Sequence, residues 1–313
     1  MKFFKKINKI SIIVLAIAFT LGLGGIIAVR AVVLPFTPDL GVASTFALLS
    51  DVFNNTSATT TINGDIGFTT FNGTAPGFGT HTNYTPAGTA GTAQATALVA
   101  LNSQDCTFSF AIGAIDLATD TTHVTAGYGS GTRDYYPGVY CIDGAASVGT
   151  AGITLNGAGT YVFRSTGALN TITGSSVTLT GDLASACDVF WTPNGATTLN
   201  HDSNFKGTVI PVSQDITVYA GVKWIGRALT FAHVVTIPDA DVAITVPTCT
   251  KPHLTVTKEV VGGGPKIANQ FPLFIDAVLT TTGAAVEVSA GSHTVTETTD
   301  SDYTQSFSAS CPG

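Results

Sequence analysis

The stretch VFWTPNGATTLNHDSNFKGTVI, residues 189–210, decides the fold class. It holds an apolar and aromatic segment at 189–191, a Thr-rich segment at 196–200 and a second apolar segment that ends at Ile210. Short runs of β-branched and aromatic residues between Gly, Asn and Pro are typical of strands separated by turns. Two alternating segment types favour the coils of a solenoid, although so ragged a repeat is also compatible with a sandwich.

The same alternation extends to both sides of this stretch. Further strands are predicted at 59–66, 139–142, 153–155, 161–164, 176–179, 215–218, 223–229 and 233–237. Residues 68–86 are predicted as a loop, because they are rich in Gly, Thr, Asn and Pro, and residues 106–137 are predicted as a second loop. The one clear helix is predicted at 89–104, because alanines recur there at helical spacing. An alanine face lets a helix lie close against a sheet, so the fold class is mainly β with one flanking helix.

Composition limits the classes of function. Charged residues make up 11% of the chain, against about 25% in typical soluble domains. The formal net charge is −7, and without the five basic residues of the first 31 it is −12, from 8 basic and 20 acidic residues. A protein this acidic is not expected to bind nucleic acid, which requires Lys and Arg against phosphates.

Residues 1–31 have the layout of a secretory signal. Lysines at 2–9 precede an uncharged apolar run at 10–27, and small residues flank Arg30 near a plausible cleavage point. The apolar run approaches the ~20 residues that span a bilayer, so an uncleaved membrane anchor is the alternative. In both cases the rest of the chain is expected outside the cell, secreted or on the surface.

Six short motifs follow one another in residues 40–248. They are TINGDIG at 61–67, YPGVY at 136–140, GTYVFR at 159–164, ACDVFW at 186–191, FKGT at 205–208 and GRAL at 226–229. In this order they resemble the bacterial ice-binding protein family of the DUF3494 type. The resemblance implies a right-handed discontinuous β-solenoid over 32–248, with the helix packed alongside. The N-terminal strands would close one end, and the chain would cross through the helix to the other.

The resemblance also implies an ice crystal surface as the partner. A flat strand face sets out side chains in a regular array, and threonine offers a methyl group and a water-binding hydroxyl in a restricted rotamer. The family's T-A/G-x-T/N motif is only partly kept at 173–176, 201–204 and 219–222, and it is lost at 238–241. The expected ice-binding residues are Thr171, Thr173, Ser176, Thr198, Asn204, Thr217 and Thr236.

Two alternatives stay open for this surface. The threonines are also what β-propensity alone predicts for exposed strand positions. The solenoid would then be a structural or adhesive domain that binds another extracellular surface without affinity for ice.

No catalytic or metal site is predicted. Asp182, Asp188, Asp239 and Asp241 read as turn residues, and the six histidines are scattered. No nucleophile, zinc or phosphate motif is present, so the chain is not expected to be an enzyme or to hold a cofactor.

The cysteines fit an oxidising compartment. Cys106 and Cys141 are predicted to pair, closing a loop that would stabilise the fold by about 3–4 kcal/mol. Cys187 is predicted to be a buried free thiol. Cys249 and Cys311 form a second candidate pair.

The tail differs from the rest. Residues 249–253 form a predicted linker and 254–313 a separate module. LTVTK at 254–258 and AGSHTVTET at 290–298 resemble the prealbumin-like or collagen-binding-B-like stalk modules of bacterial surface proteins. The resemblance implies a small, partial β-sandwich, and the chain is expected to be a fragment of a longer protein.

Overall fold

The computed structural model describes residues 3–7, 35–78, 83–84, 88–181, 184–249, 253–261, 264–288, 293–304 and 306. Contacts divide the chain into a larger unit, Pro35–Cys249, and a smaller unit made of Met1–Leu34 and Thr250–Gly313. All six sequence motifs fall in the larger unit.

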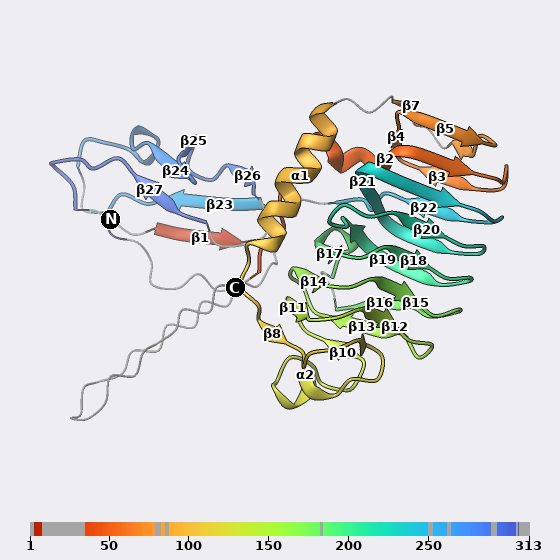
Figure 1. Cartoon of the computed structure of the whole chain (residues 1–313). Coiled ribbons are helices and arrows are strands. Elements are labelled where there is room, and N and C mark those ends of the chain that lie inside the picture. Colours follow the sequence, from red (N-terminus) through yellow and green to blue (C-terminus); the bar gives the residue numbers. More distant parts are fainter. Residues whose placement is uncertain are drawn as a thin grey trace. The chain divides into compact units, whose positions relative to one another are not determined.

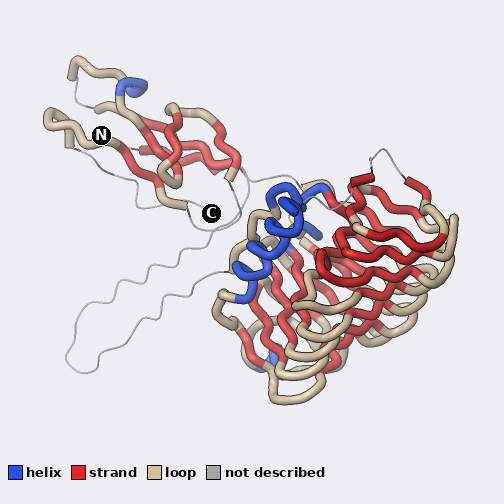
Figure 2. The backbone as a smooth tube through the Cα atoms, turned by 45° about the horizontal axis from the view of Figure 1, so that its top comes forward, coloured by secondary structure: helices blue, strands red, loops and turns tan. Residues whose placement is uncertain are grey.

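The larger unit is a stack of short parallel strands that wind into three faces (Figures 1 and 2). Face A consists of β8 (Phe108–Ser109), β11 (Gly138–Ile142), β14 (Tyr161–Ser165), β17 (Val189–Pro193), the end of β19 (Asn204–Val209), the middle of β21 (Lys223–Ile237), the start of β2 (Phe46–Asn55), β4 (Asp65–Gly67) and β7 (Asn83–Tyr84). Face B consists of β9 (Ile115–Asp116), β12 (Ala146–Val148), β15 (Leu169–Thr171), β18 (Thr197–Leu199), β20 (Ile216–Val218), the ends of β21 and β2, and β5 (Thr70–Gly73). Face C consists of β10 (Asp134–Tyr135), β13 (Ile153–Asn156), β16 (Val177–Thr180), the starts of β19 and β21, β22 (Ala243–Thr245), β3 (Thr61–Asn63) and β6 (Gly77–Phe78).

The coils do not follow the order of the chain. β2 to β7 build one end of the stack, and α1 (Gly88–Asn102) then leads to β8 at the opposite end (Figure 1). From β8 the coils return until β21 pairs with β2, which places Leu229 beside Leu49. This confirms the predicted discontinuous arrangement, in which the N-terminal strands close one end.

Aromatic side chains stack through the inside of the coils. Tyr140, Phe163 and Trp191 lie in register on β11, β14 and β17, with ring centroids 5.1 and 4.3 Å apart. Gly207 stands where β19 passes from face C to face A, with φ at +105°. A Cβ atom there would lie 2.7 Å from the carbonyl oxygen of Val189, so glycine allows the coils to stack closely.

α1 covers face A, as predicted. Ala90, Ala97 and Leu101 are buried in one cluster with the outward residues of this face. Those residues are Leu49, Val139, Val162, Phe190, Ile210 and Leu229. The small alanines bring the helix axis close to the sheet, which leaves only faces B and C free of the helix.

The helix ends two residues earlier than predicted, at Asn102. The Arg164 guanidinium donates hydrogen bonds to the carbonyl oxygens of Asn102, at 2.5 Å, and of Gln104, at 3.2 Å. A cation at this point satisfies carbonyls that lack helical partners and interacts favourably with the helix dipole. Arg164 therefore holds the end of α1 against β14.

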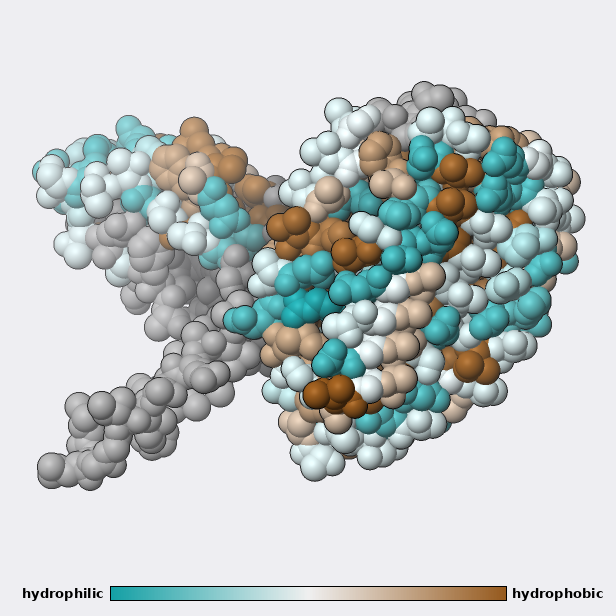
Figure 3. Space-filling model, viewed as in Figure 1, coloured by the Kyte–Doolittle hydropathy of each residue, from teal (hydrophilic) through white to brown (hydrophobic). Residues whose placement is uncertain are grey.

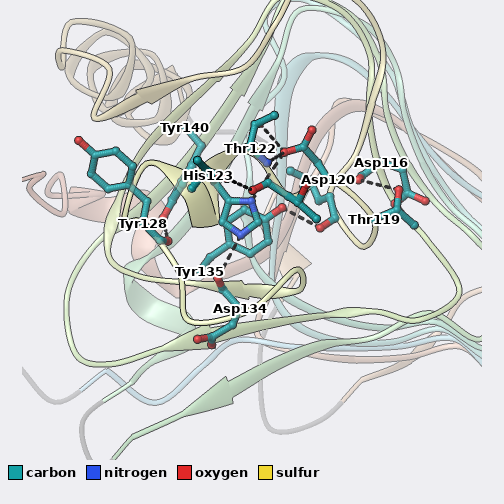
Figure 4. A network of polar contacts seen from close by, with 12 residues as sticks. Asp116, Thr119, Asp120, Thr122, His123, Tyr128, Asp134, Tyr135 and Tyr140 are labelled. Carbon is teal, nitrogen blue, oxygen red and sulfur yellow. Dashed lines mark hydrogen bonds and ion pairs between the residues drawn. The ribbon is translucent and has the colours of Figure 1, made fainter.

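The predicted loop 106–137 is instead an ordered cap at the β8 end of the stack. It contains β8, β9, β10 and α2 (Thr122–Thr125). The buried ring of His123 stacks on Tyr135 at 4.0 Å, and its Nε2 lies 3.1 Å from the carbonyl oxygen of Asp134 (Figure 4). The Tyr135 hydroxyl donates to the carbonyl of Leu117 at 2.7 Å, and burial raises the pKa of that hydroxyl.

The predicted loop 68–86 likewise contains β5, β6 and β7. These strands lie at the end of the stack and carry Gly, Thr and Asn, so they lack the apolar alternation that reveals a strand.

Two disulfides join segments of the larger unit. Cys106–Cys141 is the predicted bond, with Cα atoms 5.8 Å apart. The other prediction is wrong, because Cys187 is not free and Cys249 pairs with it rather than with Cys311. Stacking of the coils brings the residues before β17 next to those after β22, a proximity that sequence spacing does not reveal. Cys311 lies outside the described residues.

In its described residues, the smaller unit contains two antiparallel sheets. One has the order β1 (Phe3–Ile7), β23 (His253–Lys258), β26 (Ala285–Glu287), and the other β25 (Val278–Thr280), β24 (Leu273–Ile275), β27 (Val295–Glu297). Leu254, Val256, Leu273 and Ile275 form one buried cluster, so the two sheets share a core. The likeness to stalk modules stays a prediction.

No helix in the described residues is long and apolar enough to cross a membrane. The predicted signal or anchor at 10–27 lies outside the described residues.

Candidate functional site

The three faces differ in what they present outward. Face A is covered by α1. Face C carries Lys206 and Lys223 at outward positions, and burial lowers the pKa of Lys206. In the described residues, face B has neither a covering helix nor a lysine on its strands, and Asp116 of β9, in register with Ser147, places a carboxylate at one end. The strands from β12 to β5 are therefore best suited to an uncharged surface array.

A single row of polar side chains runs down the middle of face B. Each member except Asn72 sits between two buried residues of its strand, and each pairs in register with the next. This central row consists of Ser147, Asn170, Thr198, Thr217, Thr236, Asn54 and Asn72. Strands lie about 4.7–4.9 Å apart, so the row repeats at that interval.

The structure brings together three of the predicted site residues. Thr198, Thr217 and Thr236 are consecutive members of the central row. Thr173 is exposed, but it stands in the turn after β15. Ser176 and Asn204 pair through an isolated parallel β-bridge at the start of face C, so they belong to a different surface.

Thr171 was predicted to face ice, and that prediction is wrong. Its side chain is fully buried and points into the coil. Its hydroxyl donates to Ser203 Oγ at 3.1 Å and accepts from the Asn200 backbone at 2.7 Å. In β15 the inward positions are Leu169 and Thr171, which leaves Asn170 as the outward residue.

Sequence reasoning missed four members of the central row: Ser147, Asn170, Asn54 and Asn72. The family's T-A/G-x-T/N motif falls in the turns, whereas the row occupies the middle position of each short strand. A search for a polar residue between two buried positions, as in A-S-V, L-N-T, T-T-L and I-T-V, would have found most of it.

One end of the central row is hydrogen-bonded within itself. Asn72 Nδ2 donates to Asn54 Oδ1 at 2.9 Å, and Asn54 Nδ2 donates to Thr236 Oγ1 at 3.2 Å. Thr198 and Thr217 make no side-chain hydrogen bond to other described residues, which leaves their hydroxyls available to water. The row thus combines a fixed amide end with a water-accessible hydroxyl end.

Two His–Asp pairs stand at the edges of face B. His233 Nδ1 lies 3.7 Å from Asp215 Oδ1 at the edge toward face A. His201 Nε2 lies 3.5 Å from Asp239 Oδ2 at the edge toward face C, and its ring stacks on Tyr219 at 5.1 Å. These side chains flank the central row on both sides.

Small residues lie beside the central row on one side. Ala145, Ala168 and Ala196 precede three successive strands of face B. On the side of the larger unit seen in the space-filling view, strongly hydrophobic residues occur in separate spots among polar and weakly apolar ones, rather than in one patch (Figure 3).

Comparison with known proteins gives a consistent result for the larger unit. The sequence model of the ice-binding-like family matches residues 49–243. An ice-binding protein from the Antarctic ascomycete Antarctomyces psychrotrophicus is 26% identical, with a TM-score of 0.55, over 68% of this chain and 100% of that one. An ice-binding protein from an Antarctic Flavobacteriaceae bacterium is 26% identical, with a TM-score of 0.56, over 74% of this chain and 51% of that one.

The DUF3494 domain of a Shewanella frigidimarina ice-binding protein shares the fold at 21% identity and a TM-score of 0.57, over 69% of this chain and 100% of that one. No curated protein sequence matches the chain. The family match spans most of the stack that carries faces A, B and C. The chain belongs to the ice-binding-like family.

Proposed function

We propose that this protein binds ice crystals outside the cell through face B. The observation that carries the proposal is the central row, an in-register array of hydroxyl and amide groups on an uncovered face of a member of this family. Such an array holds ordered water in a pattern fixed by the strands rather than by flexible side chains.

The side chains of the row suit this task. Threonine is restricted at χ1, so Thr198, Thr217 and Thr236 lose little freedom on contact with a crystal. Their methyl groups favour removal from liquid water, while their hydroxyls can complete a water lattice. A lysine-bearing surface such as face C would keep its own hydration and disturb that lattice.

A tyrosine at the centre of the row tests this assignment. Thr217→Tyr should lower thermal hysteresis and ice recrystallisation inhibition by roughly a factor of two or more, since central positions dominate an interface. The measurements use residues 32–313, and circular dichroism verifies that the variant is folded. The wild-type protein should also be incorporated into a growing ice hemisphere.

Thr178→Tyr is the matched control, because Thr178 is exposed on β16 of face C. It should retain full activity. Loss of activity in Thr178→Tyr with normal activity in Thr217→Tyr would move the site to face C. Exclusion of the wild-type protein from the ice hemisphere would reject ice binding altogether.

We also propose that the protein is exported. Two disulfides in the larger unit and the leader-like residues 1–31 support this, because structural disulfides persist in oxidising compartments. Fractionation of the producing cells tests it, and protein found only in the cytoplasm with reduced cysteines would contradict it.

A further inference from the structure

Strand β23 of the smaller unit has a different partner on each side. Gly283 N donates to Val256 O at 2.8 Å, and Lys258 N donates to Thr282 Oγ1 at 2.7 Å, on the side of β26. Backbone groups of alternate residues in a strand point to opposite sides. The N–H and C=O groups of Thr255 and Thr257 therefore face β1.

β1 lies within the predicted leader. Phe3–Ile7 precede the apolar run at 10–27, and the plausible cleavage point is near Arg30. Cleavage there removes β1 and leaves the edge formed by Thr255 and Thr257 without this strand. An open strand edge is a template for pairing with another extended chain.

We infer that, after the leader is removed, the β23 edge is a binding site for an extended peptide segment of another extracellular polypeptide. The segment would add to the sheet as an antiparallel strand, the arrangement that β1 already shows along Leu254–Lys258. Main-chain hydrogen bonds supply the contact, and the residues in register with β23 select the sequence.

The register defines the chemistry of the partner. Ile7 lies opposite Leu254 and Lys5 opposite Val256, and both of these β23 residues are buried. Phe3 lies opposite Lys258, whose ammonium is already paired with Glu297. The residues of an added strand that pair with Leu254 and Val256 should therefore be apolar, and in the leader sequence these positions are Ile7 and Lys5.

Peptide binding to residues 32–313 tests the inference. The probes are the peptide KFFKKINK, which is residues 2–9, its Lys5→Val form, and a scrambled peptide of the same composition. Fluorescence anisotropy should show saturable binding of the first and roughly tenfold tighter binding of the second, since one more apolar side chain is buried. The scrambled peptide should not bind.

Two protein variants locate the binding. Thr257→Pro removes the N–H group that faces β1 and should abolish peptide binding, whereas Thr257→Ala keeps that group and should bind normally. Both should retain the thermal hysteresis of the parent protein, so the result is independent of ice binding. Melting curves verify that the Pro variant is folded.

Several results would overturn the inference. Equal binding of the scrambled peptide, or undiminished binding to Thr257→Pro, would show that the contact is not strand addition at this edge. A mature dimer that Thr257→Pro dissociates and that takes up no peptide would assign the edge to a second copy. An exported protein that keeps residues 1–31 on N-terminal sequencing would show that the edge never opens.

Discussion

Thr171 and Thr198 show how one residue type serves opposite purposes in neighbouring coils. Thr198 is the outward middle residue of β18, whereas Thr171 is the inward last residue of β15. The inward hydroxyl is acceptable because Ser203 and Asn200 satisfy it. Composition shows that such threonines are abundant. Which of them reach solvent depends on which positions of each strand point outward.

We expect Thr171→Val to destabilise the larger unit by about 1–3 kcal/mol, because the Asn200 N–H would lose its buried acceptor. Chemical denaturation measures the change, and Thr171→Ser, which keeps the hydroxyl, is the control. Ice-growth inhibition at temperatures where the variant is folded should be unchanged. Reduced inhibition by a fully folded variant would mean that Thr171 contacts ice after all.

Asp188 gives a prediction about pH. Burial raises the pKa of its carboxyl group, although a 2.6 Å hydrogen bond from the Thr37 hydroxyl opposes the shift. The folded state therefore binds this proton more tightly than the unfolded state, whose pKa is about 3.9. The contribution of Asp188 to stability is therefore largest below the unfolded-state pKa. It falls as the pH rises from there through the raised folded-state pKa, and it stays low above that pKa.

Asp188→Asn should consequently raise the melting temperature at pH 7 and leave it nearly unchanged at pH 3. Calorimetry at the two pH values measures both effects, and the amide oxygen can still accept from Thr37. A variant that melts lower than the parent at pH 7 would show that the charge itself is stabilising.

At the scale of elements, α1 illustrates a conflict between helix propensity and packing. Gly91 lies against Phe231, and a Cβ atom there would come within 2.3 Å of the ring. Nothing lies within 4 Å of a Cβ atom at Gly88. Alanine improves the intrinsic helix propensity at either site by up to about 1 kcal/mol, so the two sites separate the two effects.

Gly91→Ala should therefore destabilise the larger unit, since overpacking costs about 1–3 kcal/mol, whereas Gly88→Ala should be neutral or slightly stabilising. Denaturant midpoints of the two variants provide the comparison. Equal stabilisation by both substitutions would mean that α1 does not rest tightly on Phe231.

The sequence predicted the elements that have a strong pattern and missed those that do not. The strands at 139–142 and 189–192 are recognisable because aromatic and β-branched residues are concentrated there in short runs. β8, β9 and β10 pair near the end of the stack and are two residues long, so they leave no periodicity to detect. Among the polar middle positions of face B, Thr198, Thr217 and Thr236 were predicted. The other members of the central row become evident only when the coils are placed in register.

At the scale of the whole molecule, the two disulfides close the stack at different places. Cys106–Cys141 ties the cap and spans 35 residues, while Cys187–Cys249 ties the end of the last coil and spans 62 residues. In the loop-entropy description, each bond lowers the conformational entropy of the unfolded chain and so stabilises the fold by about 4 kcal/mol. The first bond could be predicted from the sequence. The second could not, because it depends on how the coils stack.

Replacing Cys106 and Cys141 by Ala should lower stability by about 3–4 kcal/mol and expose the cap around His123 to solvent. Hydrogen exchange of residues 105–137 measures the exposure, and replacement of Cys187 and Cys249 is the comparison that should leave this cap protected. Unchanged exchange in the first variant would show that the aromatic packing of the cap suffices.

The pairing of β2 with β21 determines when the stack can close during synthesis of the chain. Residues 46–55 leave the ribosome long before residues 223–237, so the first strand has to wait for its partner. Until β21 exists, β2 offers unpaired backbone that invites aggregation or chaperone binding. A chain with this order is expected to close its stack only after β21 has emerged, late in synthesis.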